Sequence, residues 1–148
     1  MDFTLIYFAF LEEHGVTLLL GSVTTIKVLI CSIILYVIIS MIFGLMRISK
    51  NKVIQGIATG YIEFFRGTSL LVQLFWFYYV LPFFGLSLEA FWAGVISLGM
   101  NFGAYGAEIV RAGILAVPKG QWEAAHALNF CPAIRLKSII IFQIFEIV

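Results

Sequence analysis

The chain alternates long apolar blocks with short polar stretches. Three blocks cover about residues 18–46, 57–84 and 88–110, and a shorter apolar run covers about 138–148. A helix needs about 20 apolar residues to cross a bilayer core, so the first three blocks are long enough and the last is about half a span. The pattern predicts an all-α, polytopic transmembrane bundle with three full spans and the start of a fourth.

The first block contains one charge, Lys27. A Lys at the bilayer centre costs about 3 kcal/mol on insertion scales, whereas one nearer a helix end can reach the headgroups. We favour the second placement, with a Lys in a polar translocation path as the alternative. The residues before this block include no Lys or Arg. The block therefore lacks the flank of a cleavable signal peptide, and we expect it to be retained.

Two pairs of opposite charges recur at the same spacing. Glu63 and Arg66 lie three residues apart in the second block, and Glu108 and Arg111 repeat that spacing at the end of the third. Residues three apart share a helix face, so each pair can neutralise itself near the membrane. We predict both as structural ion pairs.

The second and third blocks differ in composition. Pro82 and Gly85 mark the end of the second block, because they cannot continue a regular helix. In the third, small residues recur four apart at Gly99, Gly103 and Ala107. A stripe of small residues lets another membrane helix approach closely, so we predict a helix-packing face here.

Basic residues gather after the first and third spans and set the orientation. They are Arg47, Lys50, Lys52, Arg111, Lys119, Arg135 and Lys137. Cytoplasmic loops carry an excess of Lys and Arg. We therefore expect an extracytoplasmic N-terminus and a cytoplasmic polar segment over about residues 112–137.

Composition supports lipid as the surrounding solvent. Hydrophobic residues make up 62% of the 148 residues and charged residues only 11%, with a net charge of +1 and a mean hydropathy of +1.07. Soluble domains carry roughly a quarter charged residues. Scattered basic residues argue against nucleic acid as a partner. Cys31 and Cys131 have no metal-ligand spacing, and we interpret both as packing residues.

The cytoplasmic segment predicts a short helix. Pro118 suits a first helical turn and Asn129 can end a helix in the left-handed conformation. Glu123 stands beside Ala124 and Ala125, which make a surface of low relief. So short a helix needs a partner or tertiary packing. It suits either a groove on another protein or a resting place on the headgroups.

Family resemblance favours the first interpretation. The string Glu123-Ala124-Ala125, followed by Asn129 at a glycine-like position and by Ile139, resembles the EAA loop of binding-protein-dependent ABC transporter permeases. The segments Glu63–Gln73 and Ala104–Ile114 resemble one branch of that superfamily, the polar amino acid permeases. The resemblance extends from about residue 21 to residue 143.

The resemblance implies the membrane subunit of a type I ABC importer in a bacterial inner membrane. Such a subunit pairs with a second copy or a sister permease, and an extracytoplasmic binding protein delivers the amino acid. The EAA loop docks on a cytoplasmic ATPase dimer. The matching positions are Gly120, Gln121, Glu123, Ala124, Ala125 and Asn129. The chain has no phosphate-binding loop of its own, so we expect neither enzyme activity nor a cofactor in it.

The sequence departs from the family pattern in three places. Asn129 replaces a usual Gly, and Ile141-Phe142 replaces Leu-Pro. The third departure is the ending within the fourth apolar run, where the family continues. We therefore expect a truncated form of a permease that is inactive or poorly assembled alone.

Two other functions are less favoured. An ion-coupled transporter or channel subunit could use Lys27, Glu63 and Glu108 as a relay, but both carboxylates have a nearby Arg. A membrane enzyme would need a shared site, and His14 and His126 fall on opposite sides of the membrane in this orientation. We assign no catalytic residue and no metal ligand.

Overall fold

The computed structural model describes the backbone of residues 3–118 and 120, and side chains from His14 onward. All of its regular elements are helical, in the order α1, α2, α3, η1, η2, α4. The fourth apolar run, predicted over 138–148, lies outside the described residues.

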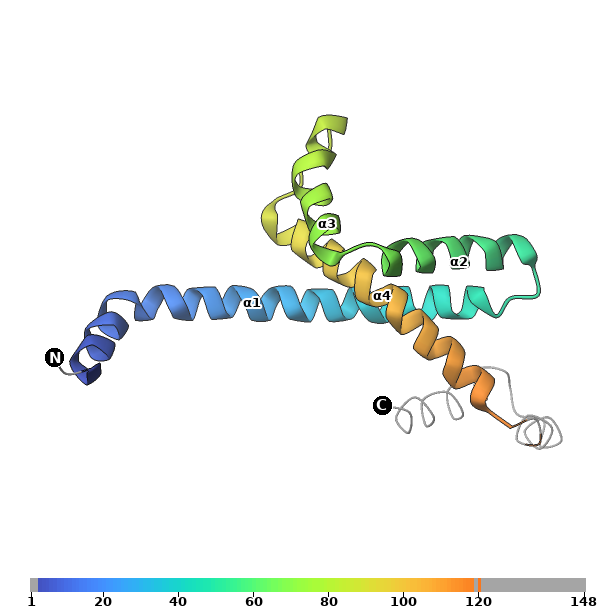
Figure 1. Ribbon diagram of the computed structural model, residues 1–148, viewed down its shortest axis with the longest axis horizontal. Coiled ribbons are helices and arrows are strands. Elements are labelled where there is room, and N and C mark those ends of the chain that lie inside the picture. The colour runs from blue at the N-terminus through green and yellow to red at the C-terminus, as the bar shows by residue number, and fades with distance from the viewer. Residues whose placement is uncertain (1–2, 119, 121–148) are drawn as a thin grey trace.

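Helix α1 (Phe3–Arg47) forms the long axis of the molecule (Figure 1). It contains the first predicted span but begins well before it. Its 45 residues correspond to about 67 Å at a rise of 1.5 Å per residue. The part from His14 to Arg47 is long and apolar enough to cross a membrane.

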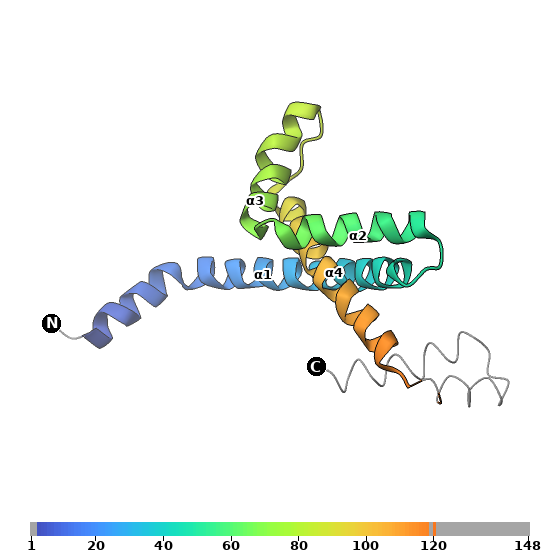
Figure 2. The same cartoon turned by 45° about the vertical axis from the view of Figure 1, so that its right-hand side comes forward.

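Helix α2 (Lys52–Gly67) runs back along the second half of α1 (Figures 1 and 2). The Asn51 side chain caps its first turn, accepting a hydrogen bond of 3.0 Å from the backbone N–H of Val53. The ring of Tyr61 stacks on that of Phe43 of α1 at 3.9 Å between centroids. The cap and the stacked rings set where α2 begins and which face it turns to α1.

The second predicted block is not one straight helix. After α2, helix α3 (Leu70–Phe75), the π-helical turn η1 (Trp76–Val80) and the 3₁₀ turn η2 (Leu81–Phe84) continue in a new direction. The two parts are bent by 100° at the break, and Figure 1 shows α3 leaving the axis shared by α1 and α2. The predicted end of the block is correct, because Gly85 adopts a φ of 83° there.

Helix α4 (Ala90–Ala116) crosses α1 and makes the most extensive helix contact in the described part of the chain. It continues past Arg111, so residues 112–116, expected in the cytoplasmic loop, are still helical. Its buried face consists mainly of small and polar residues, with Val95 and Val110 among them. Within the described residues, α1 is long and apolar enough to cross a membrane, as is the bent segment from Lys52 to Phe84 if it is taken as one span. A span at α4 stays a prediction.

The predicted stripe of small residues packs against α1. A Cβ added at Gly99 would lie 2.6 Å from Leu35 Cδ2, and one at Gly103 would lie 2.9 Å from Ile39 Cβ. Ala107 is fully buried, and its carbonyl oxygen would lie 3.0 Å from a Cβ added at Gly44. The two backbones therefore approach more closely than larger side chains would allow.

Candidate functional site

The break between α2 and α3 consists of two extended residues, Thr68 and Ser69. Their φ and ψ values are −112° and 146°, and −68° and 137°. Extended residues interrupt the i to i+4 bonding of a helix, which leaves carbonyls of the last turn of α2 without their helical donors. In a bilayer each such carbonyl needs another partner, since an unsatisfied one costs several kcal/mol.

Two buried amides supply these partners. Gln73 Nε2 donates to the Phe65 carbonyl at 3.0 Å, to Thr68 Oγ1 at 2.6 Å and to the Thr68 carbonyl at 3.3 Å. Asn101 Nδ2, from α4, donates to the same Phe65 carbonyl at 3.1 Å and to Gln73 Oε1 at 3.2 Å. Gln73 is 5% exposed and Asn101 is 6% exposed. The network joins α2, α3 and α4 and holds the bend in place.

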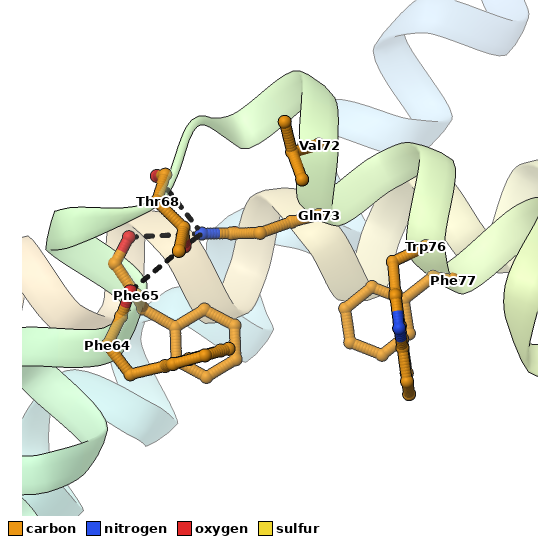
Figure 3. Close-up of a pocket in the computed structure, with 7 residues that line it drawn as sticks. All are labelled: Phe64, Phe65, Thr68, Val72, Gln73, Trp76 and Phe77. Atoms are coloured by element: carbon orange, nitrogen blue, oxygen red, sulfur yellow. Dashed lines mark hydrogen bonds between the residues drawn. The ribbon is translucent and has the colours of Figure 1, made fainter.

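A cavity of about 220 Å³ lies beside this network (Figure 3). Its lining residues are Phe64, Phe65, Thr68, Val72, Gln73, Trp76 and Phe77. Figure 3 shows the Gln73 side chain extending toward Thr68, with aromatic rings from α2 on one side and from η1 on the other. The accessible walls of the cavity are almost entirely apolar, because the Gln73 amide beside it is buried and bonded within the network.

The first predicted ion pair is not formed. Within the described part of the chain, Glu63 and Arg66 are both exposed and make no ion pair with each other. The Arg66 guanidinium instead lies over the ring of Tyr105 of α4, with 5.3 Å between its central carbon and the ring centroid. A cation over an aromatic face is stabilised by the ring quadrupole, which competes with pairing along the helix.

The second predicted pair, between Glu108 and Arg111, is formed, and a further arginine joins it. Arg111 Nη1 lies 3.4 Å from Glu108 Oε2, and Arg47 Nε lies 3.2 Å from Glu108 Oε1. Arg47 is the last residue of α1. The carboxylate therefore links α4 both to itself and to the end of α1.

The coupling positions proposed from the family resemblance fall at the edge of the structure. Gly120 is helical, whereas Gln121, Glu123, Ala124, Ala125 and Asn129 lie outside the described residues. Among the residues that are described, no three His, Cys, Asp or Glu side chains are placed to hold a metal ion.

Sequence reasoning missed Gln73, Asn101 and Arg47. Gln73 and Asn101 are amides inside apolar blocks, and a polar residue in a membrane helix usually has a structural or functional partner. That signal was available for both. Nothing in the sequence alone pairs Arg47 with Glu108, because they are brought together only by the crossing of α1 and α4.

Comparison with known proteins identifies relatives of one kind. Residues 36–144 match the family model of the binding-protein-dependent transport system inner membrane component. A probable amino-acid ABC transporter permease of Sinorhizobium fredii is 48% identical over 74% of this chain and 49% of its own length. The L-cystine transport system permease TcyB of Bacillus subtilis is 40% identical over 86% of this chain and 54% of its own.

A solved structure shares the fold. The crystal structure of an amino acid ABC transporter with histidines superposes with a TM-score of 0.74 at 41% identity, covering 93% of this chain and 65% of the matched chain. The chain spans about half the length of the curated relatives described above.

Proposed function

Because the chain belongs to the binding-protein-dependent transport system inner membrane component family, we propose that it is a membrane-spanning permease subunit of an ATP-driven importer for polar amino acids. The relatives named as amino-acid permeases support this substrate class. The subunit pairs with a second permease copy or a sister permease. It receives substrate from an extracytoplasmic amino-acid-binding protein.

The observation that carries this proposal is the broken α2–α3 pair beside the cavity. Broken helices are tolerated at membrane depth only where the freed backbone is buried in protein or lines a cavity. In transporters such breaks accompany substrate sites. Here the freed carbonyls of Phe65 and Thr68 are bonded by Gln73 and Asn101. We place the substrate pathway along this bend.

Energy enters from the cytoplasmic side in this proposal. The EAA loop, with Glu123 at its charged position, docks on a separate ATPase dimer, and ATP hydrolysis is the work of that dimer. The basic residues after α1 and α4 support a cytoplasmic position for these helix ends, with the N-terminus outside. Closure of the ATPase dimer then changes the access of the pathway.

Stimulated ATP hydrolysis tests the proposal. The permease subunit that includes this sequence is reconstituted in proteoliposomes with its cognate ATPase, and the cognate amino-acid-binding protein is added with and without a polar amino acid. We expect loaded binding protein to raise the hydrolysis rate several-fold. Hydrolysis at the same rate with and without loaded binding protein would contradict the assignment of this chain as the subunit that links the two.

A further inference from the structure

The cytoplasmic ends of α1 and α4 are joined by a carboxylate with two arginine partners. Glu108 Oε1 lies 3.2 Å from Arg47 Nε and Glu108 Oε2 lies 3.4 Å from Arg111 Nη1. The side chains are 19% exposed for Arg47, 23% for Glu108 and 38% for Arg111. Because the pair between helices is the more shielded one, solvent and salt weaken it less than a surface ion pair.

Neutralisation alone does not account for this arrangement. Arg111 lies three residues from Glu108 on the same helix, so it can balance the carboxylate without any help from α1. The contact with Arg47 adds a second cation and leaves the cluster with a net positive charge. What that contact supplies is a charge attraction, without hydrogen-bond geometry, between two helices that are far apart in sequence.

Close packing surrounds the link. A Cβ added at Gly44 would lie 2.8 Å from Val110 Cβ, so the two backbones nearly touch one turn before Arg47. Val110 is 6% exposed. Gly44 leaves room on α1 for Val110 of α4, and the ion pair adds a polar contact between the two helices three residues further along α1.

The contact between Glu108 and Arg47 lies near the ends of both helices. Helix α4 ends at Ala116, directly before the segment that contains Glu123, and α1 ends at Arg47 before the turn into α2. A movement of the segment after α4 therefore reaches α1 and α2 through the contact between Glu108 and Arg47. We propose that Glu108 is a positioning residue that passes the movement of the EAA loop to α1; this rests on the proposed function.

Four variants separate this role from simple charge balance. Glu108→Gln and Arg47→Gln each remove the link between helices. Arg111→Gln is the matched control, because it removes only the partner within α4. The double variant Arg47→Glu with Glu108→Arg reverses the link and keeps the net charge of the cluster.

The first readout is amino acid taken up per ATP hydrolysed, in proteoliposomes with the cognate ATPase and binding protein. We expect Glu108→Gln and Arg47→Gln to lower this ratio about tenfold while ATP hydrolysis stays within about twofold of the wild type. Arg111→Gln should keep the wild-type ratio, and the reversed pair should recover most of it. An unchanged ratio in Glu108→Gln, or an equal loss in Arg111→Gln, would overturn the proposal.

The second readout does not depend on transport. Backbone hydrogen exchange of the chain in lipid nanodiscs should be several-fold faster in Glu108→Gln at both helix ends, over residues 43–47 and 110–116, and unchanged in Arg111→Gln. Unchanged exchange at α1 would overturn the link itself. If the variants show these exchange differences but the wild-type protein supports neither stimulated ATP hydrolysis nor uptake, the proposed function is refuted and the link between the helices stands.

Discussion

Gln73 of α3 and Asn101 of α4 are bonded to each other, with 3.2 Å between Asn101 Nδ2 and Gln73 Oε1, and both donate to the carbonyl of Phe65. One backbone oxygen of α2 is thus shared by two amides from two other helices. The bend between α2 and α3 depends on that sharing, since the carbonyl has lost its helical donor.

Replacing Asn101 by Leu should destabilise the bend. The substitution removes two hydrogen bonds, leaves Gln73 Oε1 without its donor and is expected to cost roughly 2–3 kcal/mol. Thermal unfolding in detergent should show the loss. Ser97→Ala is the matched control, because Ser97 is fully buried on the same helix but bonds only the Ala93 carbonyl one turn back. Equal effects of the two changes would contradict the network's role.

Adding a methyl group at Gly99 should separate α1 from α4. The new Cβ would meet Leu35 at 2.6 Å, and overpacking of this kind costs about 1–3 kcal/mol. The expected result for Gly99→Ala is a lower unfolding temperature and weaker cross-linking between cysteines placed on α1 and α4. Gly94→Ala serves as the control, because its Cβ would lie 3.9 Å from Val28 Cγ1 in ordinary contact. A Gly99→Ala chain as stable as Gly94→Ala would show that the close approach is not needed.

Reversing the charge of Glu123 should separate the chain from its ATPase. Glu123→Lys is expected to reduce co-purification of the ATPase at least tenfold while membrane insertion is unchanged. Glu89→Lys makes the same charge change just before α4, on the opposite side of the membrane in our orientation, and should leave co-purification intact. Co-purification of the ATPase with Glu123→Lys at the wild-type level would count against docking through the EAA loop.

The orientation can be checked by labelling single cysteines in intact cells. With Cys31 and Cys131 replaced by Ser, we expect an impermeant thiol reagent to label Ser87→Cys, in the loop between η2 and α4. Ser49→Cys, in the turn between α1 and α2, should be labelled only after the membrane is opened. The reverse pattern would invert the topology derived from the basic residues.

The sequence predicted the helices better than their junctions. Long apolar blocks predict membrane helices, and the spacing of Gly99 and Gly103 predicted the packing face of α4. The bend at Thr68 and Ser69 was not foreseen, although Gly67, Thr68 and Ser69 interrupt the apolar pattern there. One of the two amides that stabilise the bend, Asn101, comes from α4 and cannot be assigned to it from local sequence. Glu108 and Arg111 were paired correctly from local spacing, whereas Glu63 and Arg66 have the same spacing and do not pair. Tyr105, from another helix, lies next to Arg66, and such a competitor is invisible to local spacing.

The most direct test of the account is amino acid uptake. Proteoliposomes containing the permease subunit that includes this sequence, its cognate ATPase and any sister permease are supplied with binding protein and a labelled polar amino acid. The account predicts accumulation inside the vesicles that requires both ATP and the binding protein and is insensitive to ionophores. Accumulation that persists without ATP and collapses with the ion gradient would contradict it.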